Sequence, residues 1–174
     1  MSPPDLPAGP YVAEPHPTPV RRGELIAEIE QLPARLRSLV GGLPAGQLER
    51  RYKNWNVRQI VHHLADSHMN AFVRFRLTLT EERPTIKPYD ETRWAELPDS
   101  KSADVTLSLQ LLEALHARWV LLLRAMSDAD FERSYFHPEY QKEFRLAEVL
   151  GLYAHHGRHH TGQIAWLSQR PKRD

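Results

Sequence analysis

Apolar residues recur at intervals of three and four in four long segments of this 174-residue chain. This spacing places them on one face of an α-helix, whereas a half-buried strand would need strict alternation. The segments span roughly residues 22–41, 56–80, 104–126 and 146–169. Four amphipathic helices, two of them joined to their neighbours by long connections, predict an all-α fold: a four-helix bundle with long crossover connections.

The apolar line of each segment identifies the face that is expected to meet its neighbours. The lines carry Leu25, Ile29, Leu32, Leu36 and Val40 in the first segment; Val57, Val61, Leu64, Ala71, Phe72 and Phe75 in the second; Leu107, Leu111, Leu115, Trp119, Leu122 and Met126 in the third; and Val149, Tyr153, Ile164 and Leu167 in the fourth. Asn56 is expected to cap the second helix, because Gln59 stands three residues later, as a capping box requires.

The remaining stretches are expected to surround this bundle. Residues 1–21 form a Pro-rich N-terminal arm that is expected to run extended over the surface, since proline disfavours helix at its own and the preceding position. Residues 22–174 then form one bundle domain. The polar connection at 81–103 is either a solvated crossover or a functional loop in which Tyr89, Asp90 and Trp94 cover the mouth of a site. Alternating aromatic residues in 132–145 predict a short hairpin.

Composition excludes several classes of function. A formal net charge of +1 gives no basic face for nucleic acid. The chain has no cysteine, so disulfides and thiolate ligands are impossible. The longest apolar run, 119–123, is far shorter than the roughly 20 residues of a membrane span, and the N-terminus has no apolar core typical of a signal peptide. We therefore expect a cytoplasmic protein that acts on a small molecule, without a membrane or nucleic-acid partner.

Four histidines lie within six positions of the last helix, at 155, 156, 159 and 160. Histidines four apart on a helix can chelate one metal ion. His156 and His160 continue the apolar line from Tyr153 to Ile164, while the other pair falls beside it, so His156 and His160 are the expected ligands. The metalloprotease pattern needs glutamate after the first histidine, and Gly157 stands there instead.

A catalytic site needs a third protein ligand and an open position. The second helix offers His62, His63 and His68. Helical spacing favours His63 over His68 only slightly, since His63 borders the apolar line and His68 lies on the line from Leu64 to Ala71. Nearby, Asp66 is a candidate to orient a ligand or a water molecule. Two alternatives stay open at this point: histidines satisfied within the core by hydrogen bonds, and a surface patch that chelates metal without function.

Three motifs, VRQIVHHLADSHMNAFVRF, KPYDETRWAELPDS and LGLYAHHGRHHTGQI, give the chain a resemblance to the DinB/YfiT-like metalloenzymes, specifically to the YfiT branch. The similarity extends from about residue 11 to 168. It implies a four-helix bundle, usually a homodimer, with one divalent metal ion, zinc or nickel, held by three histidines. Matching the motif residue by residue, the ligands are His63, His156 and His160.

The resemblance implies an enzyme of one of two kinds. Some members are described as metal-dependent hydrolases; others are similar to thiol S-transferases that join a low-molecular-weight thiol, such as bacillithiol, to an electrophile. Both use a metal ion to activate a small nucleophile. Candidate contacts for an anionic substrate are Asn70, Arg74 and Arg158. A non-catalytic bundle is the remaining alternative, with a structural metal completed by His159 or Asp66 as fourth ligand.

Overall fold

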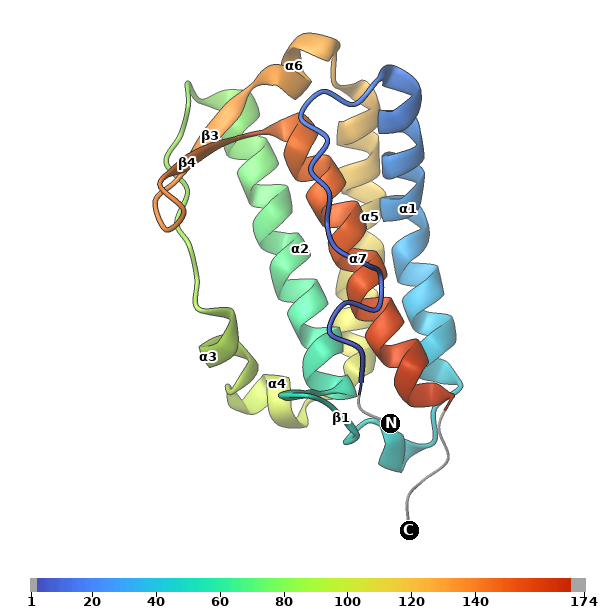
Figure 1. Cartoon of the computed structure of the whole chain (residues 1–174). Helices are drawn as coiled ribbons and strands as arrows, with labels where there is room; N and C mark the ends of the chain where they lie inside the picture. Colours follow the sequence, from blue (N-terminus) through green and yellow to red (C-terminus); the bar gives the residue numbers. More distant parts are fainter. Residues whose placement is uncertain (1–2, 170–174) are drawn as a thin grey trace.

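Four long helices pack side by side and form a bundle (Figure 1). The computed structural model describes residues 3–169; residues 1–2 and 170–174, at the outer ends of the expected arm and domain, lie outside the described residues. The long helices are α1 (Pro19–Gly41), α2 (Val57–Thr80), α5 (Val105–Ala125) and α7 (Leu146–Ser168). The expected bundle with long crossover connections is confirmed.

The bundle places α1 diagonally opposite α2, and α5 diagonally opposite α7. Helix α1 packs against α5 and α7, and α2 packs against the same two helices from the other side. The order around the bundle is therefore α1, α5, α2, α7. As a result, the seam between α2 and α7 brings together the two histidine-rich segments of the sequence.

Capping residues set the helix bounds. Asn56 caps α2, and its side chain and that of Gln59 exchange hydrogen bonds with each other's backbone, as the capping box predicts. Thr18 caps α1, and Pro19 occupies the first turn, where its missing N–H costs nothing. Helix α1 consequently begins at residue 19, earlier than the expected start at 22.

Short elements fill the connections between the long helices. They are the 3₁₀ turn η1 (Ala45–Gln47), the strands β1 (Arg51–Tyr52) and β2 (Trp55–Asn56), the helices α3 (Glu91–Ala95), α4 (Pro98–Ser102) and α6 (Asp128–Glu132), and the strands β3 (Ser134–His137) and β4 (Lys142–Arg145). Strands β3 and β4 pair antiparallel and confirm the expected hairpin. The 81–103 connection is ordered by α3, α4 and a bridge from Thr85 to Phe136.

The N-terminal arm lies along α7 (Figure 1). The Tyr11 hydroxyl donates to the Glu148 carbonyl at 3.2 Å, and the Tyr52 hydroxyl donates to the Pro4 carbonyl. Gly162 lets the arm approach closely, since a Cβ there would lie 3.0 Å from Cβ of Pro7. Among the described helices, none is both long and apolar enough to cross a membrane.

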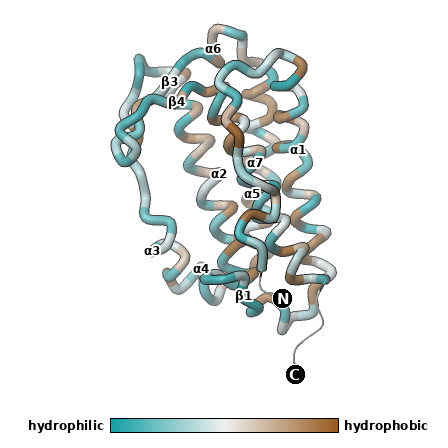
Figure 2. The backbone as a smooth tube through the Cα atoms, in the orientation of Figure 1, coloured by the Kyte–Doolittle hydropathy of each residue, from teal (hydrophilic) through white to brown (hydrophobic). Residues whose placement is uncertain are grey.

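Two apolar clusters make up the core, one toward each end of the bundle. The first includes Phe75, Trp119 and Tyr153, and the second includes Leu64 and Ile164. Hydrophobic and hydrophilic residues alternate along the long helices (Figure 2). His68, His116 and His160 lie between the two clusters along α2, α5 and α7, and His63 lies among the α2 residues of the second cluster. Their polar layer therefore interrupts the core where the metal ligands are expected.

The expected apolar face of α5 needs a correction. Leu107 and Leu111 are 60% and 43% exposed, although Trp119, on the same predicted line, is fully buried. The face that enters the core is carried instead by Val105, Leu109, Leu112, His116, Trp119, Val120 and Leu123. Helix α5 is apolar on two faces, so periodicity alone selected a line that runs partly along the exterior.

Candidate metal centre

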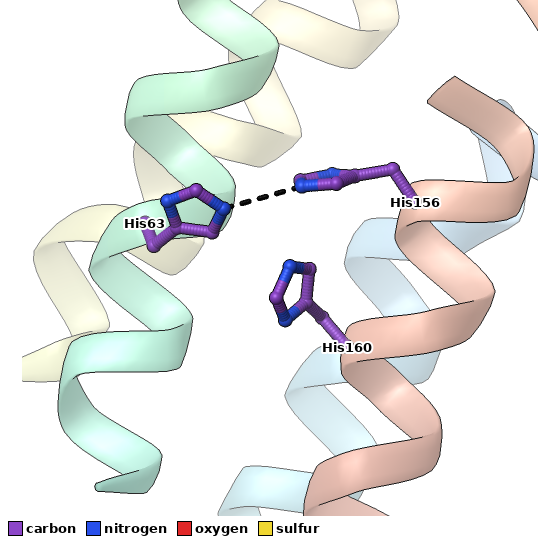
Figure 3. Close-up of side chains that lie close together, drawn as sticks. All are labelled: His63, His156 and His160. Carbon is purple, nitrogen blue, oxygen red and sulfur yellow. Dashed lines mark hydrogen bonds between the residues drawn. The ribbon is translucent and has the colours of Figure 1, made fainter. Parts of the chain in front are cut away.

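Three histidines from two helices converge at the α2–α7 seam (Figure 3). His63 comes from α2, while His156 and His160 lie one turn apart on α7. One nitrogen of each ring lies within 4.8 Å of the other two, and the Nε2 atoms of His63 and His156 are 3.2 Å apart. These are the three residues that the family resemblance selected as ligands.

The spacing fits a single ion. Two imidazole nitrogens at about 2.0–2.1 Å from a tetrahedral metal are separated by roughly 3.3–3.4 Å. The 3.2 Å between the Nε2 atoms of His63 and His156 is close to that edge. One of these two nitrogens can donate to the other (dashed line in Figure 3), and both lone pairs can face one cation when each ring carries its proton on Nδ1. The donor set therefore fits a divalent metal ion.

Burial keeps the ligand rings neutral. Removal from water lowers the pKa of His63 to about 4 and lowers the pKa of His156 and His160 well below the usual value of 6.5. Trp55, in β2, covers His63 with ring centroids 4.5 Å apart. Neutral imidazoles offer free lone pairs at physiological pH, so a cation can bind without first displacing protons.

Gln163 orients His160. Its side-chain Oε1 lies 2.8 Å from Nδ1 of His160, and its Nε2 lies 3.0 Å from Nε2 of His159. The amide oxygen can only accept, so Nδ1 of His160 carries the proton and Nε2 is left free for a metal. His159, which the structural-metal alternative uses as a fourth ligand, is engaged by Gln163 instead.

A chain of hydrogen bonds orients His156 in the same way. The carbonyl oxygen of Ile29 lies 2.6 Å from Nδ1 of His116; Nε2 of His116 lies 3.0 Å from Nδ1 of His68; and Nε2 of His68 lies 3.2 Å from Nδ1 of His156. We call His116 and His68 the histidine relay. Burial lowers the pKa of both rings, so each is neutral and has one donor and one acceptor nitrogen.

The direction of these hydrogen bonds follows from the group on which they end, the carbonyl of Ile29. A carbonyl can only accept, so Nδ1 of His116 donates to Ile29 and Nε2 of His116 must accept from His68. The same reasoning applies to the next ring. Because Nδ1 of His68 donates to His116, Nε2 of the neutral His68 ring accepts from Nδ1 of His156. The proton of His156 is therefore on Nδ1, and its Nε2 lone pair faces the site. An oriented partner of this kind tightens metal binding in general.

The other predicted site residues lie around this centre. Asp66 is half-buried; burial, with the charge of Asp99, raises the pKa of its carboxyl to about 6. Asn70 donates to the backbone carbonyl of Asp66 at 2.9 Å, and Arg158 forms an ion pair with Glu28 of α1. Within the described residues, Asp66, Asn70 and Arg158 form no hydrogen bond with the three ligand histidines.

A pocket of about 200 Å³ opens beside His156. Its lining combines an arginine, phenols and carboxylates from α2, the 81–103 connection, the β3–β4 hairpin and α7: Ser67, Arg74, Tyr89, Glu91, Tyr135, His137, Glu139 and Tyr153 are among them. Of the predicted substrate contacts, Arg74 lines it, while Asn70 and Arg158 do not. Tyr89 also lines it, consistent with the expected site cover.

Sequence reasoning missed the relay and Gln163. One signal was present: His116 continues the buried line Leu109, Leu112, Trp119, where a polar ring needs a partner. That partner could not be named from the sequence, because His68 belongs to another helix. Gln163 lies three residues after His160, a spacing at which helical side chains meet, and it could have been proposed.

Comparison with known proteins agrees with this geometry. The family model of the DinB superfamily matches residues 28–164. The chain belongs to the DinB superfamily. Both histidine-rich segments lie inside the matched range, so the metal centre belongs to the part of the chain that this superfamily shares.

Several DinB relatives are similar over most of their length. The protein named "Putative metal-dependent hydrolase YfiT" from Bacillus subtilis is 47% identical over 152 residues, which cover 86% of this chain and 85% of the relative. A Bacillus mycoides protein, whose name also begins "Putative metal-dependent hydrolase", is 52% identical over 147 residues, which cover 83% of this chain and 84% of the relative.

The solved structure of YfiT from Bacillus subtilis superposes with a TM-score of 0.92 at 45% identity, and the match covers 95% of both chains. It is described as "a probable metal-dependent hydrolase with an unusual four-helix bundle topology". The match covers all four long helices of this chain, so the two proteins share the bundle.

Proposed function

We propose that this DinB protein is a metal-dependent hydrolase whose ligands are His63, His156 and His160. The observation that carries the proposal is an incomplete set of protein ligands beside a pocket. Within the described residues, the metal-competent cluster holds three histidines and no fourth histidine or carboxylate. Catalytic sites keep such an open position, whereas structural sites are closed by four protein ligands.

The chain's own residues prepare this position. The histidine relay and Gln163 direct two Nε2 lone pairs inward, and Trp55 shields His63 from water. When bound, a divalent ion such as zinc or nickel supplies a Lewis acid that lowers the pKa of a water or thiol ligand. The pocket beside His156 then places a small substrate next to the activated nucleophile.

Asp66 was a candidate to orient a ligand or a water molecule, and we now propose only an indirect role for it. Its carboxyl has no hydrogen bond to a ligand histidine among the described residues, and its raised pKa of about 6 suits a group that exchanges protons near neutrality. Arg74 is the proposed anchor for an anionic part of the substrate, because it lines the pocket.

Metal content tests the ligand set. Changing His63, His156 or His160 to alanine is expected to abolish stoichiometric zinc or nickel in dialysed protein, since two imidazoles hold such ions weakly. His155→Ala is the matched control, because that ring packs on Tyr11 of the arm, away from the cluster. Full metal occupancy in His156→Ala would contradict the site.

The choice of nucleophile needs a separate assay. Metal-loaded protein is mixed with activated esters, amides and electrophiles, with and without a low-molecular-weight thiol. The hydrolase proposal expects turnover without thiol. Turnover that strictly requires thiol would reject it in favour of the thiol S-transferase alternative.

A further inference from the structure

The pocket beside His156 contains an arginine that has no acidic partner. Arg74, on α2, donates to the Tyr153 hydroxyl at 3.5 Å, and it also interacts with Tyr135. No carboxylate within the described residues forms an ion pair with it, whereas eight other described arginines are paired with one. A half-buried guanidinium surrounded by neutral phenols still needs an anion.

His137 supplies a second unsatisfied group in the same pocket. It lies at the end of β3 and is 5% exposed, and its Nδ1 has no hydrogen-bond partner within the described residues. Buried polar nitrogens are nearly always paired, so an unpaired one that lines a pocket indicates a ligand. Burial, and after it the nearby charge of Arg74, lowers the pKa of His137, so its ring is neutral and can donate through Nδ1. We call Arg74 and His137 the inner donors.

The phenols of the pocket support the same anion. Burial raises the pKa of Tyr89 and Tyr135, so both keep their protons at physiological pH. A phenol that accepts from a guanidinium still has its own O–H to donate. The inner wall is therefore rich in donors, which suits a carboxylate or phosphate group.

Charge of the opposite sign gathers at the pocket mouth. Glu91, at the start of α3, and Glu139, in the β3–β4 turn, line both the inner pocket and an outer groove of about 550 Å³. Neither forms an ion pair within the described residues, and burial, followed by the charge of Glu139, raises the pKa of Glu91. Two repelling carboxylates at one passage favour a cation between them. We call them the mouth carboxylates.

We propose that this pocket binds a small zwitterion, with its anionic group on the inner donors and its cationic group between the mouth carboxylates. Amino acids and their derivatives are molecules of this class. His156 lines the same pocket, so a bound molecule lies next to one of the proposed metal ligands. The inference deepens the proposed function, on which it rests only for the position of the metal beside the pocket.

Calorimetric titration with simple probes tests the proposal. The probes are ω-amino acids from glycine to aminocaproate, with caproate as the anion alone and hexylamine as the cation alone. Protein freed of metal by a chelator is used alongside zinc-loaded protein, so that binding of a carboxylate to the ion is recognised. At least one amino acid is expected to bind about tenfold more tightly than either single-charge probe, in both forms of the protein.

Substitutions identify which residues bind the anionic and the cationic group of the probe. Arg74→Met is expected to weaken the binding of the amino acid and of caproate about tenfold. Arg76→Met is the control, at an exposed arginine that covers Phe72 on the same helix, and it is expected to leave both affinities unchanged. The double change of Glu91→Gln and Glu139→Gln is expected to weaken the binding of the amino acid and of hexylamine and to leave the affinity for caproate unchanged. These two side chains are exposed, so this variant tests the proposal even if Arg74→Met fails to fold.

Two results would overturn the proposal. One is an absence of binding by every amino acid of the series, or equal binding of caproate and its amino counterpart. The other is wild-type affinity after Arg74→Met and after the double glutamine change. Metal content measured on the same samples separates the two proposals, because a chain that binds the zwitterion but no zinc contradicts only the metal-dependent hydrolase.

Discussion

At the scale of single residues, the centre depends on which nitrogen of each histidine holds the proton. The histidine relay ends on the carbonyl of Ile29, and that acceptor fixes the tautomer of every ring up to His156. A ligand held in the correct tautomer needs no rearrangement when a metal arrives. The relay is thus expected to contribute to metal affinity from two helices away.

His116→Leu tests this contribution. Without the His116 ring, Nδ1 of His68 has no acceptor that holds the proton on that nitrogen. His156 then no longer prefers the proton on its own Nδ1. We expect zinc affinity to fall about 10–100-fold, measured by competition with a chromophoric chelator. His116→Gln, which can still donate to Ile29, is expected to recover part of the loss.

His62→Gln is the control for the relay. His62 is also a buried histidine of α2, but its ring bonds to Ser108 and to the Ala103 carbonyl, outside the relay. Zinc affinity is expected to stay close to wild type in this variant. If His116→Leu bound zinc as tightly as His62→Gln, the relay would have no role in the metal centre.

The sequence predicted the residues of the centre unevenly. His156 and His160 followed from helical spacing, because they continue a buried line on one helix. His63 could not be separated from His68 in that way, and the structure shows why: both rings point into the seam, where one faces the cluster and the other bonds to His156. Only the resemblance to a family distinguished them.

At the scale of elements, the contact between α7 and α1 requires a glycine. A Cβ on Gly157 would lie 2.8 Å from Cδ2 of Leu32, and Leu32 is buried. Gly157→Ala is expected to destabilise the fold by about 1 kcal/mol, because overpacking of 1–3 kcal/mol exceeds the roughly 1 kcal/mol gained in helix propensity. Urea denaturation measures the change.

Gly23→Ala provides the matched control on α1. A Cβ there would meet no atom within 4 Å, so only helix propensity changes. We expect this variant to be more stable than wild type by up to about 1 kcal/mol. Equal stabilisation by both alanines would show that α7 and α1 do not need the close approach at Gly157.

Helix ends were easier to predict than helix faces. Asn56, Gln59 and Asp104 act within one turn of the chain, so their capping roles can be read locally. The buried face of α5 depends on which side meets α1 and α2, and that is a property of the assembled bundle. For this reason Leu107 and Leu111 were assigned to the wrong side.

At the scale of the whole molecule, the exposed leucines of α5 suggest a partner. Leu107, Leu111 and Leu121 are 60%, 43% and 70% exposed and lie within one face of the helix. A line of large apolar side chains is unfavourable in water unless another surface covers it. We propose a second copy of this chain as that surface, in keeping with the homodimer that the family resemblance implies.

Light scattering measures the assembly directly. We expect a mass of about twice the 20.2 kDa of one chain. The double change of Leu107→Glu and Leu121→Glu is expected to give monomers. Val20→Glu, at a 75% exposed valine of α1, should leave the mass unchanged. A monomeric wild-type protein would reject the dimer without affecting the metal centre.

The sequence predicted the bundle but not the order of its helices. Four periodic segments require a helical core, whereas the neighbours of each helix depend on long connections whose path the pattern does not determine. The diagonal placement of α1 and α2 is what brings α2 beside α7. The ligand set of His63, His156 and His160 could therefore be assembled only from the fold or from a relative.

X-ray absorption at the zinc edge tests the central claim, a three-histidine centre with an open position, most directly. Zinc-loaded protein is expected to show three imidazole ligands and one further light atom at about 2.0–2.1 Å. Adding a small thiol is expected to replace that atom by sulfur at about 2.3 Å. A spectrum with four protein ligands that thiol leaves unchanged, or one without imidazole scattering, would contradict the account.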